Sequence, residues 1–209
     1  MSENTIPLAD RFLELIVVLL LGITTIGTAW CGFQAARWNG QSGDLTGEAS
    51  AQRVEGSRLF GLATQRITYD SMVVAKYAEA AQQRNVELQQ FYRRSVVRPA
   101  FLPFLDRWEA AAKAGKPTVG VFEDKDYLAE QFADYNKTVV AAEQAARESQ
   151  KADEFQEAYV GTTILLAVAL FFAGVTSSFK SRFARILLLI AATGSVAVAA
   201  ARIATLPII

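Results

Sequence analysis

Residues Leu15 to Ala36 read LIVVLLLGITTIGTAWCGFQAA, an uninterrupted run of 22 residues without a formal charge. Residues Ala158 to Phe179 read AYVGTTILLAVALFFAGVTSSF, a second uncharged run of 22 residues. As a helix rising 1.5 Å per residue, each run extends about 33 Å and spans a bilayer hydrocarbon core of about 30 Å. The two runs predict transmembrane helices over 15–36 and 158–179, and therefore an integral membrane protein.

A third uncharged run, Ile186 to Ala201, has 16 residues and lies between Arg185 and Arg202. It is short for a span, but arginine side chains extend toward the headgroups from the ends of membrane helices. We therefore predict a third transmembrane helix over 183–206. The fold class expected is an all-α integral membrane protein with three transmembrane helices.

The short loop between the last two spans predicts the orientation. Residues 180–185 hold three basic side chains and no acid, and short basic loops face the cytoplasm. This places the N-terminal tail, residues 1–14, in the cytoplasm and residues 37–157 outside it. The first run exceeds the 7–15 apolar residues typical of a signal peptide, and Glu3, Asp10 and Glu14 precede it, so we predict a retained span.

Composition argues against several function classes. The 209 residues include 21 Lys and Arg and 21 Asp and Glu, so a net charge of zero gives no electrostatic reason to expect nucleic acid as a partner. The chain has no histidine and one cysteine, Cys31, which removes histidine-based nucleophilic catalysis and cysteine-rich metal sites. We therefore expect no enzyme activity, no catalytic residues, no cofactor and no metal.

The segment between the first two spans predicts a long helical hairpin, or stalk. Residues 48–97 contain no proline, and small or apolar side chains recur three and four residues apart, which is typical of a coiled-coil seam. The seam comprises Phe60, Ala63, Ile67, Val74, Tyr77, Ala81 and Leu88, with Asp70 and Arg84 at its two missing steps. These two charges either pair with another helix or subunit, fixing register, or point to water. The seam also predicts self-association through residues such as Ile67, Val74 and Tyr77.

Proline and cap residues predict how the hairpin turns back. The outgoing helix is expected to end near Val97, because Pro99 and Pro103 disfavour helical geometry in the residues before them. A short helix over 104–114 and an extended piece over 118–122 follow. A second long helix, capped by Asp124 or Asp126, then leads to the second span.

Small residues recur every four positions in the first span: Thr24, Thr28, Gly32, Ala36 and Gly40. Such ridges allow membrane helices to approach closely, either within one subunit or between subunits. A second set of residues lies at the predicted boundaries of the spans, where amphipathic and cationic side chains favour the membrane interface. This set consists of Trp30, Gln34, Arg37, Trp38 and Arg202.

Several motifs together resemble one family. They are AWCGFQAARWNGQ at 29–41, RVEGSR at 53–58, FYRR at 91–94 with RPAFLP at 98–103, LFFAGVT at 170–176 and TLP at 205–207. The family comprises small, uncharacterised bacterial membrane proteins with one span, a helical middle and two closing spans. The resemblance implies the bacterial cytoplasmic (inner) membrane and no particular reaction.

Two functions remain after these exclusions. The first is a non-enzymatic membrane interaction or scaffold protein, either a homo-oligomer or an accessory subunit of a bacterial envelope complex, with membrane lipids and a protein of that complex as expected partners. The second is an oligomeric channel, which needs a polar stripe along one span. The first span offers only a partial stripe, so the interaction protein is the favoured hypothesis.

Overall fold

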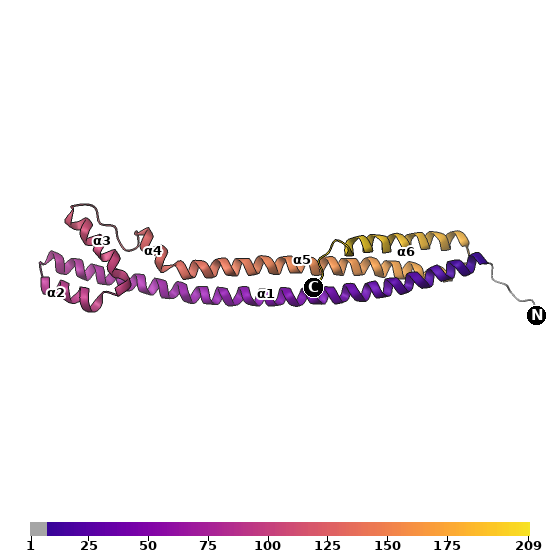
Figure 1. The fold of residues 1–209 in the computed structure, drawn as a ribbon, viewed down its shortest axis with the longest axis horizontal. Coiled ribbons are helices and arrows are strands. Elements are labelled where there is room, and N and C mark those ends of the chain that lie inside the picture. The colour runs from indigo at the N-terminus through magenta and orange to yellow at the C-terminus, as the bar shows by residue number, and fades with distance from the viewer. Residues whose placement is uncertain (1–7) are drawn as a thin grey trace, which may run out of the picture. The chain divides into compact units, whose positions relative to one another are not determined.

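The computed structural model describes residues 8–209, and every regular element in that range is a helix (Figure 1). The first seven residues of the predicted N-terminal tail lie outside the described residues, and residues 8–14 are already helical. The elements are α1 (Leu8–Gln82), α2 (Val86–Phe91), η1 (Tyr92–Val96), η2 (Pro99–Phe101), α3 (Leu102–Lys113), α4 (Lys125–Gln131), α5 (Ala133–Val175), η3 (Thr176–Ser178) and α6 (Arg182–Ile203).

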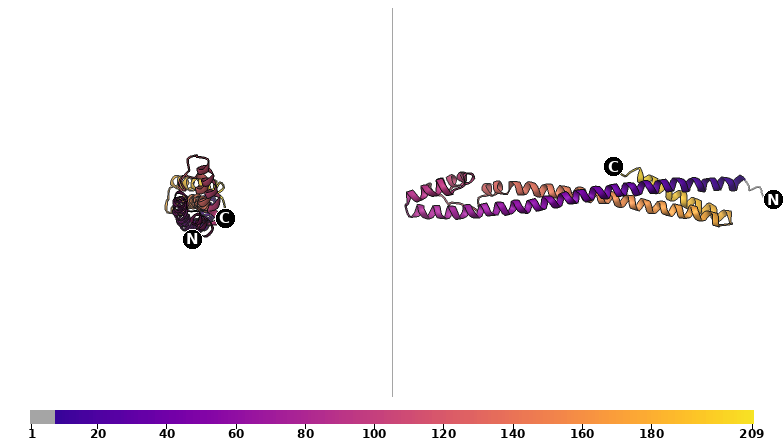
Figure 2. Two further views of the ribbon diagram at one scale, coloured as in Figure 1. Left: turned by 90° about the vertical axis from the view of Figure 1, so that its left-hand side faces the viewer. Right: turned by 90° about the horizontal axis from the view of Figure 1, so that it is seen from below.

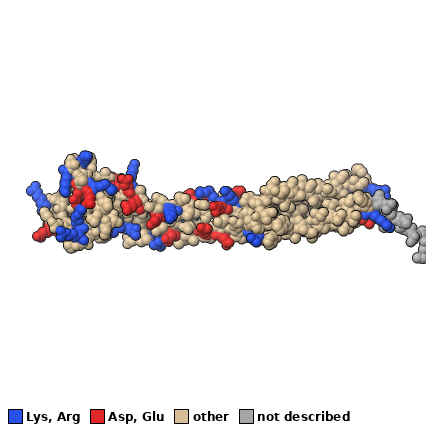
Figure 3. Space-filling view, in the orientation of Figure 1, with Lys and Arg blue, Asp and Glu red and all other residues tan. Residues whose placement is uncertain are grey.

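The chain forms two compact units, and α1 and α5 each contribute to both. The first unit contains the described residues up to Gly47 together with Ala145–Ile209. Its parts of α1 and α5 lie side by side with α6, as the views in Figures 1 and 2 agree. All three helices are long and apolar enough to cross a membrane. Figure 3 shows an uncharged surface along the middle of these three helices, with charged side chains at both of its ends.

Two apolar clusters hold the first unit together. One contains Leu20, Ala173, Leu189 and Ala192, so it joins all three helices. The other contains Cys31, Trp38, Tyr159, Leu166 and Ala199 among its buried members. A Cβ at Gly27 would lie 3.3 Å from the Leu166 side chain, so α1 and α5 approach closely there and a larger residue would displace that side chain.

The second unit, Glu48–Gln144, contains the rest of α1, the short helices and the start of α5. Its core lies around α3, where the fully buried Phe101 and Leu105 contact a cluster that includes Ile67, Tyr77 and Tyr127. The ring centroids of Phe101 and Phe104 are 4.9 Å apart, and Tyr127 meets Phe101 edge-on. An aromatic core of this kind fixes the short helices against α1.

The prediction of one outgoing helix over 48–97 is wrong, because α1 ends at Gln82. Arg84 has a φ of +57°, in the left-handed region, and the Asn85 N–H bonds the Ala80 carbonyl in the pattern of a Schellman cap. The Asn85 side chain then accepts a hydrogen bond from the Leu88 N–H and caps α2. The turn of the hairpin therefore begins 15 residues before the predicted end at Val97.

The return path follows the sequence more closely. The helix predicted over 104–114 is α3, Leu102–Lys113, with Pro103 in its first turn. Residues 121–123 form a turn rather than an extended piece, and Asp124 caps α4 by accepting from the Tyr127 N–H at 2.8 Å. The second long helix is interrupted at Phe132, after which α5 continues without a break to Val175.

Candidate functional site

Asp70 is the centre of a buried ionic cluster in the second unit. Its side chain is 1% exposed and accepts two hydrogen bonds from the Arg98 guanidinium, one of them 2.9 Å from Nε to Oδ1. The Tyr127 hydroxyl donates to Asp70 Oδ2 at 2.5 Å. The cluster therefore joins α1, the segment before η2 and α4 at a single carboxylate.

The titration of these groups reflects the same contacts. The hydrogen bond to Asp70 raises the pKa of the Arg98 guanidinium above its usual range. Burial, assisted by the neighbouring Asp70 carboxylate, raises the pKa of the Tyr127 phenol. Both shifts favour the protonated donors, so the cluster keeps its hydrogen bonds at neutral pH.

A second polar network lies on the same unit. The Tyr77 hydroxyl donates to Glu109 Oε1 at 2.5 Å, and Arg93 Nη1 donates to the same oxygen at 3.0 Å. Arg93 also forms an ion pair with Asp106. Burial and the hydrogen bond to Glu109 raise the pKa of Tyr77 to about 12. This network ties α3 to α1 and η1.

These contacts revise the interpretation of the predicted seam. Ile67 and Tyr77 are buried and Val74 is half-buried, and all three pack in the core of their own unit. Asp70 is paired, but with Arg98 of the same chain. Arg84 is exposed at the turn and lies on no helix. The seam therefore serves packing within the chain, and its predicted role between subunits stays untested.

An aromatic surface remains on the outside of the second unit. Phe60 is 48% exposed, stacks on Phe132 with ring centroids 5.6 Å apart and meets the edge of Tyr135 at 5.4 Å. A pocket of about 440 Å³ lies beside these rings, bordered also by Leu128 and Lys125. We call Phe60, Phe132 and Tyr135 the aromatic surface.

The small-residue ridge of the first span changes face along α1. Thr24 is buried and Thr28 half-buried, whereas Gly32, Ala36 and Gly40 are exposed. A step of four residues turns a helix about 40° past a full turn, so the ridge rotates about 160° from Thr24 to Gly40. A Cβ at Gly32 or Gly40 would meet no atom within 4 Å. Only the start of the ridge therefore packs within the chain.

Gln34 and Trp38, which the sequence predicts at the membrane interface, hold the C-terminal segment. Gln34 is fully buried, and its amide both donates to the Ile209 carbonyl and accepts from the Ile209 N–H, each at 3.2 Å. Trp38 Nε1 and the Tyr159 hydroxyl both donate to the Pro207 carbonyl, at 3.2 and 3.1 Å. Three side chains thus satisfy the backbone of residues 207–209, a set of contacts for which the sequence carries no local signal.

The other three interface residues are exposed. Trp30 is 41% exposed and lies 6.1 Å from Phe33, centroid to centroid, while the Arg37 guanidinium lies 5.9 Å above the Phe33 ring. Arg202 is exposed near the end of α6, close to Gly161 of α5. These positions are compatible with contacts to lipid headgroups.

Within residues 8–209, no three acidic or cysteine side chains come close enough together to hold a metal ion. Comparison with protein families, curated proteins and solved structures finds no match to the chain. The function must therefore be inferred from the contacts of the chain itself. These are two ion-pair networks in the second unit, the aromatic surface on the outside of that unit, and the exposed face of α1 that carries Gly32, Ala36 and Gly40.

Proposed function

We propose that the chain is a multi-pass protein of the bacterial inner membrane with a non-enzymatic interaction role, acting as a homo-oligomer or as an accessory subunit of an envelope complex. In this proposal α1, α5 and α6 cross the membrane, and the Glu48–Gln144 unit is displayed outside the cytoplasm. The basic loop 180–185 supports this orientation, since it connects the last two candidate spans.

The observation that carries the proposal is the division of roles in the second unit. Its buried and half-buried charged groups bind one another: the buried Asp70 pairs with Arg98, and the half-buried Glu109 with Arg93. Groups engaged in this way rigidify the unit, because each donor and acceptor of the network has a partner within the chain. The aromatic surface, by contrast, exposes Phe60 beside a pocket, and aromatic side chains are enriched where proteins dock.

The first span supports self-association. Gly32, Ala36 and Gly40 are exposed on α1, and small residues of this kind let a second helix approach closely in lipid. Because a Cβ at Gly32 would meet no atom within 4 Å, we expect a larger side chain there to leave the monomer folded. Its effect on assembly is therefore separable from its effect on folding.

The test compares Gly32→Leu with Gly174→Leu, a control at an exposed helical glycine of α5. A Cβ at either glycine meets no atom within 4 Å, but Gly174 is not on α1 and so is not part of the ridge. We expect an oligomeric mass for the wild type in mild detergent, a lower mass for Gly32→Leu and no change for Gly174→Leu. A monomeric wild type without co-purifying subunits, or equal effects of both changes, would refute the proposal.

The channel hypothesis has no comparable support. The hydroxyls of Thr24 and Thr28 donate to backbone carbonyls of their own helix, at 2.5 and 2.8 Å. Gln34 bonds the backbone of Ile209. The polar groups that would form a stripe along the first span are therefore engaged within the chain.

A further inference from the structure

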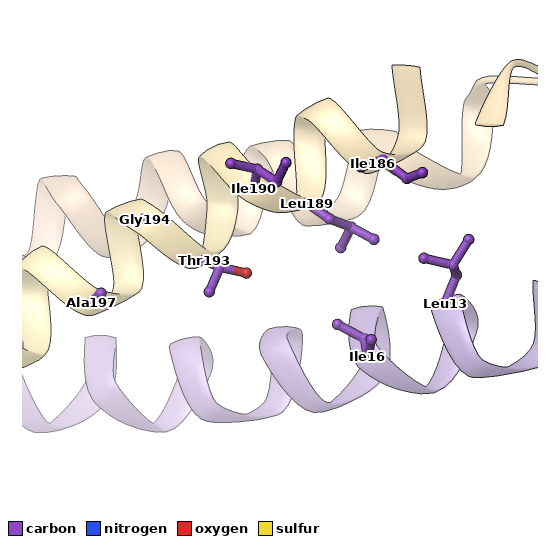
Figure 4. A pocket seen from close by; sticks show the side chains of 8 residues that line it. All are labelled: Leu13, Ile16, Ile186, Leu189, Ile190, Thr193, Gly194 and Ala197. Atoms are coloured by element: carbon purple, nitrogen blue, oxygen red, sulfur yellow. The ribbon is translucent and has the colours of Figure 1, made fainter. Parts of the chain in front are cut away.

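An apolar groove runs between α1 and α6 in the first unit (Figure 4). It has a volume of about 490 Å³, and its lining includes Leu13 and Ile16 of α1 and Leu189, Ile190, Gly194 and Ala197 of α6. In Figure 4 Leu13 and Ile16 point from α1 toward α6 across the gap. Ile190 is 67% exposed, so the groove is open along one side.

The length of the groove matches one leaflet of a bilayer. Its lining on α6 extends from Ile186 to Ala197, which is about 16 Å at 1.5 Å per residue. Half of a hydrocarbon core of about 30 Å is about 15 Å. An acyl chain of one leaflet, running parallel to the helices, therefore has the length that the groove accommodates.

Positive charge lies at one end of the groove. Ile186 directly follows Arg185, Arg182 begins α6, and Lys180 lies in the short loop before that helix. Arg185 lines a neighbouring pocket of about 370 Å³, together with Ser177 of η3 and Glu14 of α1. Since Glu14 repels an anion, a phosphate is favoured on the side of the loop rather than on the side of α1.

We propose that this groove binds one acyl chain of an anionic phospholipid, with the phosphate against the basic segment Lys180–Arg185. The sequence predicts this segment as a loop, but α6 begins within it, at Arg182. The guanidinium of arginine binds phosphate oxygens through two parallel N–H donors, and basic residues next to a membrane helix attract anionic lipids. The proposal deepens the proposed function, on which it rests, because it requires that the three helices lie in a bilayer.

Charge favours a lipid over a second copy of the chain as the occupant. A second copy inserted in the same orientation would bring its own basic loop to the same depth of the membrane. Like charges at that depth oppose the contact, whereas an anionic headgroup complements it. An anionic lipid is therefore the occupant that fits both the apolar groove and the basic residues at its end.

The experiment uses the full chain, purified in detergent and stripped of lipid, with native mass spectrometry to count bound lipids. The probes are phosphatidylglycerol and phosphatidylcholine with identical acyl chains. Each basic residue near a membrane surface contributes about 1 kcal/mol to binding of anionic lipid, so replacing two is expected to reduce phosphatidylglycerol occupancy about tenfold or more. The double variant Lys180→Gln/Arg182→Gln should therefore lose the preference for phosphatidylglycerol and keep binding of the neutral lipid.

A second variant tests the groove itself. Gly194→Leu is expected to fill the groove, because Gly194 lines it and a Cβ there meets no atom within 4 Å. The matched control is Gly174→Leu, at an exposed helical glycine of α5 that does not line the groove. We expect Gly194→Leu to lower the binding of both lipids and Gly174→Leu to leave it unchanged.

Three results would overturn the proposal. They are equal binding of both lipids by the wild type, unchanged lipid binding by Gly194→Leu, and a fall in the oligomeric mass of Gly194→Leu without a fall in its count of bound lipids. The third result would identify a second copy as the occupant. Extraction of native membranes with alkaline carbonate tests the proposed function separately. A chain that resists extraction but shows no lipid preference contradicts only the lipid site, and a released chain contradicts membrane insertion.

Discussion

Arg98→Leu is expected to destabilise the Glu48–Gln144 unit more than Asp70→Asn, although both substitutions remove the same ion pair. The two partners differ in burial: the Asp70 side chain is 1% exposed and the Arg98 side chain 26% exposed. The cost of each change depends on the group that is left behind.

Removal of Arg98 leaves a carboxylate without access to water. Breaking a buried ion pair from one side costs about 3–5 kcal/mol, because the remaining charge is uncompensated. Asp70→Asn keeps an amide oxygen that accepts from Tyr127, and it leaves a guanidinium that reaches solvent. Its expected cost is that of a hydrogen bond to a charged group, about 1.5–3 kcal/mol.

Hydrogen exchange of the full chain in detergent measures this difference locally. Since 1.4 kcal/mol is a factor of ten, Arg98→Leu should lower the protection of amides in residues 60–135 by about 100-fold or more. Arg94→Leu is the control, because Arg94 is an exposed residue of η1. The double variant Asp70→Leu/Arg98→Leu should be milder than Arg98→Leu, since no charge is left buried. An equal or larger loss for Asp70→Asn would refute the reasoning.

Three further predictions concern other contacts. The pKa of Tyr77 is raised from 10.0 to about 12, so between those pH values the folded state keeps a proton that the unfolded chain loses. The stability of the second unit should therefore fall as the pH rises through that range, and Tyr77→Phe should flatten this pH dependence in alkaline unfolding curves. Arg84→Gly removes the cost of a left-handed residue with a side chain, about 1–2 kcal/mol, but makes the unfolded chain more flexible, which costs about 0.4–1 kcal/mol. Thermal unfolding should therefore show a small gain in stability or none, and a clear loss of stability would contradict the cap described at this turn. Gln34→Ala leaves the backbone of Ile209 without its two hydrogen-bond partners, at a cost of about 1–3 kcal/mol, so hydrogen exchange of the C-terminal peptide should become faster. Unchanged exchange would show that these contacts do not stabilise the C-terminal segment.

The features that sequence predicted well are those set by local signals. The three apolar runs identify α1, α5 and α6, because length and absence of charge alone make a helix able to cross a bilayer. The position of α3 follows from Pro103, and the start of α4 from the capping side chain of Asp124. Each of these signals lies within a few residues of the structure that it predicts.

The end of α1 was missed because its sequence looks continuous. The apolar pattern extends past Gln82 to Leu88, and neither glycine nor proline marks the break. Arginine adopts the left-handed conformation there, which is uncommon for a residue with a side chain. The one local signal is Asn85, a favourable helix cap that sits directly after the turn.

The contacts between distant residues had no comparable signal. Asp70 in an apolar seam requires a cation, but the sequence offers several arginines, and the partner Arg98 is 28 positions away. The ridge of small residues suggested one continuous packing face, whereas a repeat of exactly four residues turns away from any straight neighbour. The close contact occurs instead at Gly27, between the steps of that ridge.

The central claim is that three helices cross the membrane and display the Glu48–Gln144 unit outside the cytoplasm. Single cysteines at Ala112 and Ser181, both exposed, test it in a Cys31→Ala background with a membrane-impermeant thiol reagent on intact cells. We expect labelling of Ala112→Cys at once and of Ser181→Cys only after the cells are opened. Labelling of Ser181→Cys alone would reverse the orientation, and equal labelling of both positions in intact cells would contradict a membrane crossing by α5, the one candidate span between them.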